Sequence, residues 1–215
     1  MRDELAEALQ ALAPAGIALA SLPLDDLHLV GLHPQEAAIV ELAGIQRRRE
    51  FATGRALLHR LLPGCAPILR TATGAPHFDA ATVGSLAHDR HHALAAVAAA
   101  TAFAALGVDL EPTQEHADDE LAEAVLRTDD SAVDPLAAFT MKEAAYKAWS
   151  TMGGGVVGPL DVRLSVTGAR FRAWMPHSPA TIDGPPSTVD GAVASAAGYG
   201  LALAVVPLPA GADRG

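Results

Sequence analysis

The stretch Phe139-Thr-Met-Lys142-Glu143-Ala-Ala-Tyr146-Lys147-Ala-Trp149, together with Gly107-Val-Asp109-Leu-Glu111 upstream, decides the fold of this chain. The upstream segment has the pattern of a strand that ends in acid. Side chains alternate along a strand, so Asp109 and Glu111 point to one side of it. The later segment has the pattern of a helix, on which Glu143 and Lys147 lie one turn apart on the same face. If the helix packs beside the strand, these charged side chains converge.

The convergence of three carboxylates has an electrostatic cost. Two like charges about 4 Å apart repel by roughly 4 kcal/mol at an effective dielectric constant of ~20. Asp109, Glu111 and Glu143 can therefore come together only around a cation. Hard oxygen ligands that leave room for phosphate oxygens suit Mg²⁺. The pattern indicates a magnesium site that these three acids form.

Composition limits the class of protein. The chain has 215 residues, 50% hydrophobic and 19% charged, enough for one good core or two small cores that share an interface. Its formal net charge of −10 argues against a nucleic-acid binder. The single cysteine, Cys65, allows no disulfide within the chain and fits a reducing compartment. No stretch is long enough to span a bilayer, and the acidic start does not resemble a signal peptide. We therefore expect a cytoplasmic protein without a membrane partner.

Helix and strand patterns are mixed along the whole chain. Asp134 and Pro135 form a good helix start, with the aspartate as N-cap and the proline at the first position. Thr167-Gly168 is a plausible hairpin turn between two short strands. The remaining elements that the pattern predicts are helices at 34–62 and 118–127, strands at 83–86, 93–98, 103–110, 162–166, 169–175 and 199–206, and a loop at 176–190.

Four blocks of the sequence carry a family resemblance. They are Arg47-Arg48-Arg49-Glu50-Phe51-Ala-Thr-Gly54-Arg55, then Gly74-Ala-Pro76-His-Phe78 with Val83-Gly-Ser85-Leu-Ala-His88, and finally the two opening segments. In this order and spacing they resemble the Sfp-type phosphopantetheinyl transferases. The arginine block is similar to that of the family's siderophore-synthetase branch. Two departures are visible: Ala87 stands where members often carry Ser or Thr, and Gly74 lacks a basic neighbour.

The resemblance implies an α+β fold of two similar α/β subdomains packed pseudo-symmetrically, with the active site at their interface. It divides the chain into residues 1–102, which anchor the nucleotide of coenzyme A, and residues 103–215, which carry the metal and catalytic residues. Because one chain then supplies both halves of the site, the expected state is a monomer.

The resemblance also implies roles for individual residues. Mg²⁺ is held by the three acids beside the pyrophosphate of coenzyme A, and Glu111 is also a candidate general base. Because one carboxylate cannot easily be a full metal ligand and a base at once, both roles of Glu111 stay open. Lys142 and Lys147 neutralise phosphate oxygens and the leaving group. Arg48, Arg55 and His88 contact the 3′-phosphate and pyrophosphate, where the fork of arginine suits bidentate binding. The implied reaction transfers phosphopantetheine to a serine of an acyl or peptidyl carrier protein.

Two other functions remain open at this point. The run from His88 to His92, with Asp109, suggests the His-Asp metal cluster of a phosphohydrolase, although its spacing is loose. A coenzyme A-binding relative without chemistry is the other alternative, and the missing basic residue beside Gly74 is its support. The sequence does not separate fatty-acid, polyketide, peptide and siderophore carriers, although the arginine block leans towards the last two.

Overall fold

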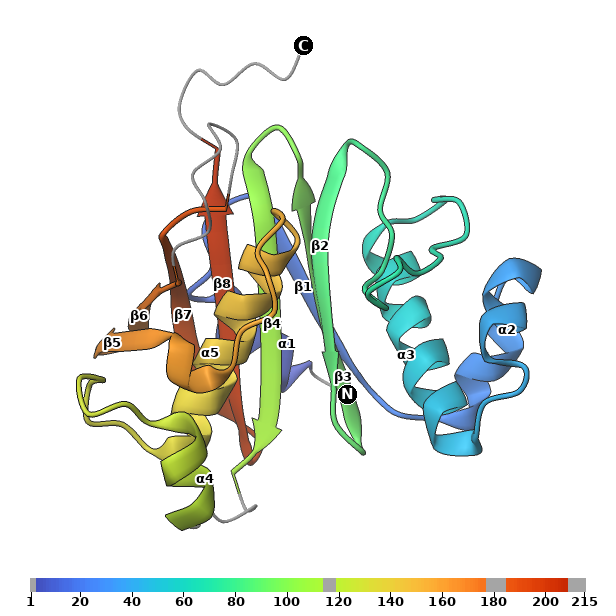
Figure 1. The fold of residues 1–215 in the computed structure, drawn as a ribbon. Coiled ribbons are helices and arrows are strands. Elements are labelled where there is room, and N and C mark those ends of the chain that lie inside the picture. The colour runs from blue at the N-terminus through green and yellow to red at the C-terminus, as the bar shows by residue number, and fades with distance from the viewer. Residues whose placement is uncertain (1–2, 114–118, 177–184, 209–215) are drawn as a thin grey trace.

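The computed structural model describes residues 3–113, 119–176 and 185–208, which form two antiparallel sheets that pack against each other (Figure 1). No helix in this part of the chain is both long and apolar enough to cross a membrane. The helical elements are α1 (Glu4–Gln10), η1 (Asp26–Gly31), α2 (Pro34–Val40), α3 (Ile45–Leu61), α4 (Asp119–Val125), α5 (Pro135–Ser150) and η2 (Pro159–Asp161). The strands are β1 (Ile17–Pro23), β2 (Thr82–His88), β3 (His92–Ala99), β4 (Phe103–Pro112), β5 (Arg163–Thr167), β6 (Arg170–Trp174), β7 (Thr188–Ala196) and β8 (Tyr199–Pro207).

The two sheets divide the strands by their order in the sequence. The first has the order β1-β3-β2 and the second the order β4-β8-β7-β6-β5, and every pairing is antiparallel. Figure 1 shows α3 beside the three-stranded sheet and α5 across the five-stranded sheet. The predicted α+β class is confirmed. The pseudo-symmetry and the division at residue 102 stay predictions.

The alternation of side chains along β3 shows why four layers form. Ala95 and Val97 pack in the core under α3 with Leu57, whereas Leu94 and Ala96 pack in the core between the two sheets. A strand that is apolar on both faces must be covered on both. The order of layers is therefore α3, the three-stranded sheet, the five-stranded sheet and α5.

Hydrogen bonds join the two sheets next to the functional residues. Ser85 Oγ of β2 accepts the backbone N–H of Val108 in β4 at 3.0 Å. The hydroxyl of Tyr199 in β8 donates to Asp89 Oδ2 at 3.0 Å. The first contact holds β2, which carries His88, against β4, which carries Asp109, and the second holds the turn after β2 against β8.

The structure corrects some of the predicted elements. The single helix expected over residues 34–62 is two helices, because Gly44 adopts an extended conformation as the N-cap of α3. The Thr167-Gly168 hairpin is confirmed, with Gly168 at φ 58°. In the loop expected at 176–190, residues 177–184 lie outside the described part, and β7 already begins at Thr188. The pattern also missed α1 and β1, which are short and rich in alanine.

Candidate functional site

The acid-ended strand and the Lys-Glu helix lie in direct contact, as predicted. A Cβ atom on Gly107 of β4 would come within 1.9 Å of the Ala144 carbonyl oxygen and 2.8 Å of the Ala148 nitrogen in α5. Only glycine permits this approach. The small side chains at these positions bring the backbone of α5 close to β4, so that charged side chains from both elements can meet.

Asp109 and Lys147 meet at this contact. The Lys147 ammonium donates to Asp109 Oδ1 at 2.6 Å and to the Val108 carbonyl oxygen at 3.1 Å. Asp109 is buried, with 6% of its surface exposed. Burial raises the pKa of its carboxyl, and the Lys147 charge opposes that rise. Within the described part of the chain, Asp109 Oδ2 is buried without a hydrogen-bond partner.

Glu143 is the second acid beside this pair. It lies one turn before Lys147 on α5 and is half-buried. Burial raises the pKa of its carboxyl, the negative charge of Asp109 raises it further, and Lys147 lowers it. The two acids are thus close enough to repel, and one lysine compensates them only in part. An unpaired oxygen beside a second carboxylate fits a bound cation.

Glu111 lies two residues beyond Asp109 on the same side of β4 and is partly exposed. The described residues nevertheless contain no group of three Asp, Glu, His or Cys side chains placed to hold a metal ion. The structure therefore brings two of the three predicted acids together and does not form a complete three-carboxylate cluster. The three-ligand Mg²⁺ site stays a prediction.

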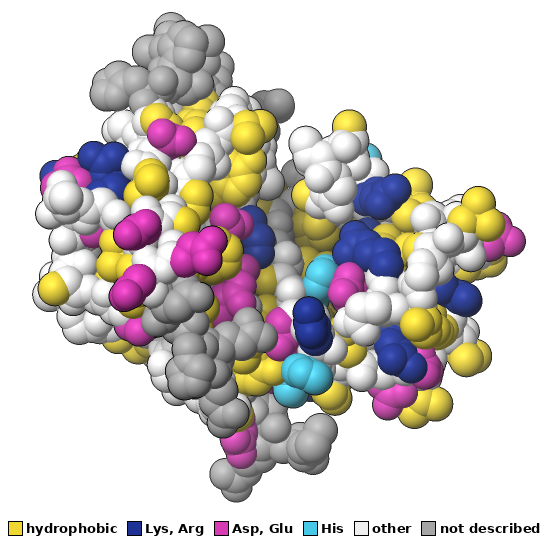
Figure 2. Space-filling model, turned by 60° about the horizontal axis from the view of Figure 1, so that its bottom comes forward, with side chains coloured by type: hydrophobic (Ala, Val, Ile, Leu, Met, Phe, Trp, Pro, Cys, Tyr) yellow, Lys and Arg dark blue, Asp and Glu magenta, His cyan; other side chains and the backbone are white. Residues whose placement is uncertain are grey.

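A cleft of about 410 Å³ opens next to this junction. Its walls come from α3, the segment 73–76, β2, the end of α5 and the glycine-rich segment that follows. Arg55 and His88 from one half of the molecule and Lys147 from the other all line it. Figure 2 shows a hollow between the two halves, with Lys and Arg side chains gathered on the half that carries α3. Three of the predicted ligand-binding residues therefore line the same cleft.

His88 belongs to a small polar cluster in the cleft wall. Arg47 Nη1 donates to His88 Nε2 at 3.2 Å and pairs with Glu50 Oε2 at 3.2 Å. Burial lowers the pKa of His88; Glu50 opposes this, while Arg47 and Lys147 add to it. A lowered pKa favours the neutral imidazole, which can accept the hydrogen bond from Arg47.

Arg55 is more enclosed than the sequence indicated. It is 2% exposed, and its guanidinium donates to the carbonyl oxygens of Ile68 and Leu69. The same group lies 4.1 Å from the centre of the Phe51 ring. Burial lowers the pKa of Arg55 to about 10. Arg55 thus supports the loop behind the cleft as well as contributing a positive charge to its wall.

Two predicted ligand-binding residues lie elsewhere. Arg48 does not line the cleft, and its charge acts instead on Asp26, whose pKa it lowers after the larger effect of Arg49. Lys142 is 2% exposed, and its ammonium bonds Asp130 Oδ2 at 2.6 Å and the carbonyl oxygens of Val125 and Pro159. Neighbouring residues on a helix point about 100° apart, so Lys142 lies off the face that Glu143 presents to β4.

Arg47, which was not predicted as a ligand-binding residue, lines the cleft where Arg48 was expected. Its signal was the recurrence of Arg47, Phe51 and Arg55 every four residues, which puts them on one face of a helix. Glu50 and the segment after Trp149 were also not predicted, because neither carries a chemical pattern.

The histidine-rich turn does not form the metal cluster of a phosphohydrolase. Asp89 accepts the backbone N–H groups of His91 at 2.8 Å and His92 at 2.6 Å, as an ordinary turn aspartate does. His92 Nδ1 lies 3.0 Å from the Tyr199 hydroxyl. Asp89 and His92 therefore connect the two sheets through the Tyr199 hydroxyl, and the described residues of this turn form no metal-binding group.

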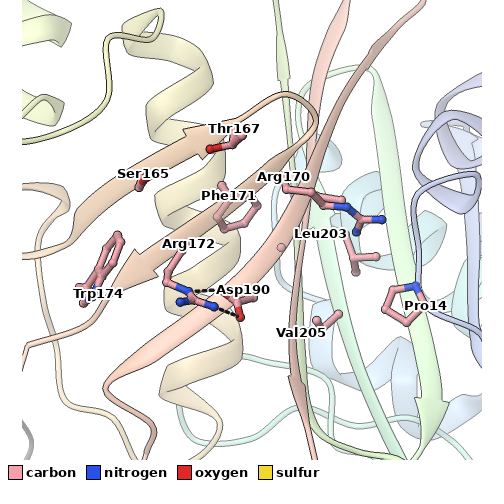
Figure 3. Close-up of a pocket in the computed structure, with 12 residues that line it drawn as sticks. Pro14, Ser165, Thr167, Arg170, Phe171, Arg172, Trp174, Asp190, Leu203 and Val205 are labelled. Carbon is pink, nitrogen blue, oxygen red and sulfur yellow. Dashed lines mark hydrogen bonds and ion pairs between the residues drawn. The ribbon is translucent and has the colours of Figure 1, made fainter.

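A second depression, of about 430 Å³, lies over strands β5 to β8 (Figure 3). Its charged residues include Arg172 and Asp190, which pair with each other at 2.6 Å. None of the residues predicted from the sequence lines it. The cleft between the halves is therefore the better candidate site.

Comparison with known proteins agrees with this choice. Residues 35–98, which include Arg47, Arg55 and His88, match the family model of the 4'-phosphopantetheinyl transferase N-terminal domain. The chain is 37% identical over 138 residues to 4'-phosphopantetheinyl transferase Svp of Streptomyces mobaraensis. The aligned region covers 57% of this chain and 56% of Svp. It thus spans little more than half the length of Svp.

A second relative is covered further. The chain is 34% identical over 159 residues to 4'-phosphopantetheinyl transferase Npt of Nocardia iowensis. The aligned region covers 66% of this chain and 68% of Npt. Both likenesses are too long to rest on a single motif. The chain therefore belongs to the 4'-phosphopantetheinyl transferase family.

Proposed function

We propose that the protein transfers the 4'-phosphopantetheine group of coenzyme A to a serine hydroxyl of an acyl or peptidyl carrier protein. The observation that carries this proposal is one cleft lined by Arg47 and His88 from one half and Lys147 from the other, beside the Asp109–Glu143 pair. A cationic wall next to under-compensated acids suits a diphosphate that arrives with a divalent cation. Family membership supports the same reaction.

The cationic wall would hold the nucleotide end of coenzyme A. Arg47 presents a planar guanidinium that suits bidentate phosphate binding. His88, kept neutral by its lowered pKa, can donate its Nδ1–H while Nε2 accepts from Arg47. Arg55 adds charge from a buried position. Arg48 and Lys142 do not line this wall.

Asp109 and Glu143 would hold Mg²⁺, with Glu111 as the third carboxylate. A cation bound there would neutralise charge on the diphosphate oxygens and thereby supply electrostatic stabilisation. Asp109 Oδ2 is buried without a hydrogen-bond partner among the described residues, so this oxygen is available to coordinate the cation. Lys147 holds Oδ1 and keeps that carboxylate oriented.

In the proposed reaction the serine oxygen attacks the phosphorus that bears the pantetheine arm. A new P–O bond forms as the bond to adenosine 3',5'-bisphosphate breaks, and Lys147 is placed to neutralise the leaving phosphate. The serine proton passes to Glu111, directly or through a water molecule. Phosphoryl transfer depends mainly on positioning and charge stabilisation, which this cleft is built to supply.

Intact-mass spectrometry of apo carrier proteins tests the proposal. We expect a phosphopantetheine mass gain with coenzyme A and Mg²⁺, a loss of that gain without Mg²⁺, and its loss in Glu143→Gln. The matched control is Glu41→Gln, which changes an exposed glutamate that does not line the cleft. No gain across fatty-acid, polyketide, peptide and siderophore carriers would refute transfer. Phosphate release without a carrier would favour hydrolysis, and Mg²⁺-dependent coenzyme binding without transfer would favour a binding protein.

We further propose that the enzyme acts as a monomer. The walls of the cleft come from both halves of one chain, so a second copy is not needed to complete it. Light scattering on the active protein checks this. Activity found only in a dimer fraction would contradict it.

A further inference from the structure

A second cluster of reactive side chains lies outside the cleft. Cys65 is the only cysteine in the sequence. Its Sγ lies 3.1 Å from Nδ1 of His59, and Nε2 of the same ring lies 2.8 Å from Oε1 of Glu36. The thiol, imidazole and carboxylate therefore form a continuous line, with one partner on each ring nitrogen.

Three separate elements build this line. Glu36 comes from α2, His59 from α3, and Cys65 from the turn after α3, where Gly64 adopts φ 77° and the Cys65 N–H bonds the Leu62 carbonyl oxygen. The Glu36 side chain is fully buried. A carboxylate on Nε2 favours the tautomer with its proton there, which turns the lone pair of Nδ1 towards the thiol. A nucleophile, a base and a group that orients the base are thus in order.

The thiol also borders a space large enough for a small molecule. A cavity of about 420 Å³ is lined by Cys65 itself, by apolar side chains that include Leu61 and Phe78, and by the polar side chains His77 and Asp79. Among the described residues, none that lines the cleft between the two halves also lines this cavity. A reagent can therefore reach the sulfur without entering the transferase site.

We propose that Cys65 is a nucleophilic thiol that undergoes exchange with a low-molecular-weight disulfide in this cavity, with His59 as the base and Glu36 as its positioning residue. The Cys65 proton passes to His59 Nδ1 as the sulfur attacks one sulfur of the disulfide. The disulfide S–S bond breaks and a new S–S bond to Cys65 forms. The released thiolate takes the proton back and leaves as a thiol, so the exchange needs no further oxidant.

The state of the free thiol makes the base necessary. Burial, followed by the charge of Glu36, raises the pKa of Cys65. The sulfur therefore keeps its proton at neutral pH and becomes nucleophilic only when His59 accepts that proton. This separates Cys65 from a cysteine that is reactive because its thiol ionises easily.

Glu36 has structural duties as well. Its carboxylate accepts the backbone N–H groups of Ile68 at 2.8 Å and His33 at 3.1 Å. A Glu36 variant therefore mixes folding with reactivity. His59 is the better position to change, because its side chain is 22% exposed.

The test uses 5,5'-dithiobis(2-nitrobenzoate), an aromatic disulfide whose coloured thiol product is followed by absorbance. Because the chain has one cysteine, all colour reports Cys65. We expect His59→Gln to slow the reaction by about tenfold or more at neutral pH. His77→Gln, which changes another histidine of the same cavity, should leave the rate unchanged. Equal rates for His59→Gln and the wild-type protein would overturn the proposal.

The wild-type protein supplies a second test that needs no variant. The native chain should react faster than the urea-unfolded chain at the same pH, because unfolding separates the thiol from its base. A native rate at or below the unfolded rate would overturn the proposal even if His59→Gln does not fold. Neither test depends on the transferase assay.

Discussion

Two faces of helix α5 each carry a lysine, and the two lysines have different roles. Lys142 faces α4 and η2, where its side chain is 1% exposed and has three oxygen acceptors. Lys147 faces β4 at the cleft, where its side chain is 29% exposed and bonds Asp109. Five residues separate the two, which is about 140° around a helix. The role of each lysine in the Lys-Glu motif therefore depends on the face of α5 on which it lies.

The comparison also explains how the site keeps its geometry. On the far face, the ion pair of Lys142 and Asp130 connects α5 to the segments around Val125 and Pro159. On the near face, Gly107 lets the helix backbone approach β4. One face holds the helix in place, so the other can present Glu143 and Lys147 to the cleft.

Removing the far-face lysine should have the largest effect on stability. Lys142→Met leaves Asp130 buried without its cation, and we expect a loss of about 3–5 kcal/mol in the free energy of unfolding. Urea denaturation followed by circular dichroism measures it. The double variant Lys142→Met/Asp130→Leu should regain part of that loss. A single variant as stable as the wild-type protein would show that this face does not anchor the helix.

Removing the near-face lysine should act mainly on catalysis. We expect Lys147→Met to lower the rate of carrier modification by about 100–1000-fold, because in the proposed reaction this lysine neutralises the leaving phosphate. Its loss of stability should be smaller than that of Lys142→Met, since Lys147 is more exposed. Carrier assays and denaturation curves on the same preparations give both values. If Lys142→Met proved the more damaging to turnover after correction for unfolded protein, the assignment of faces would be reversed.

The close approach of α5 to β4 is tested by adding one methyl group. Gly107→Ala places a Cβ atom against the backbone of Ala144 and Ala148, so the two elements must separate. We expect a stability loss of about 1–3 kcal/mol and a fall in activity. Gly31→Ala is the matched control, because a Cβ atom there meets nothing within 4 Å and Gly31 does not line the cleft. Equal stability of both variants would mean that the helix approach is less tight than described.

The smallest effect should appear as a pH dependence of stability without metal. The pKa values of Asp109 and Glu143 are raised in the folded protein, so the folded state binds their protons more tightly than the unfolded state. Their contribution is complete below the unfolded pKa values of about 4 and is lost as pH rises through the folded values. Glu143→Gln should therefore gain stability over the wild-type protein at neutral pH, and the gain should shrink towards pH ~4. Thermal melts across this range measure it; a gain that grows on acidification would contradict the repulsion.

The sequence was sufficient to predict the contact between strand and helix. The alternation of Val108 and Asp109 and the one-turn spacing of Glu143 and Lys147 are local patterns, and both were confirmed in three dimensions. What it did not reveal is which side of a helix faces which neighbour. The family resemblance implies a phosphate contact for Lys142, and only the packing of α4 and η2 shows that its side chain points elsewhere.

The arginine helix teaches the same lesson. Arg47, Arg48 and Arg49 are chemically alike in the sequence, but Arg49 pairs with Asp26 at 2.6 Å and Arg47 with Glu50. Which of these arginines is drawn away from the cleft depends on their contacts with η1, an element that the sequence pattern did not predict. The break at Gly44 also sets where α3 begins. Tertiary contacts thus decided what the local pattern left open.

Titration calorimetry of coenzyme A into the metal-free protein, with and without Mg²⁺, tests the central claim most directly. The claim is that the cleft binds the diphosphate together with a cation held by Asp109 and Glu143. We predict that Mg²⁺ tightens coenzyme binding to the wild-type protein and has little effect on Asp109→Asn or Glu143→Gln. Equal tightening by Mg²⁺ in all three proteins would contradict the claim.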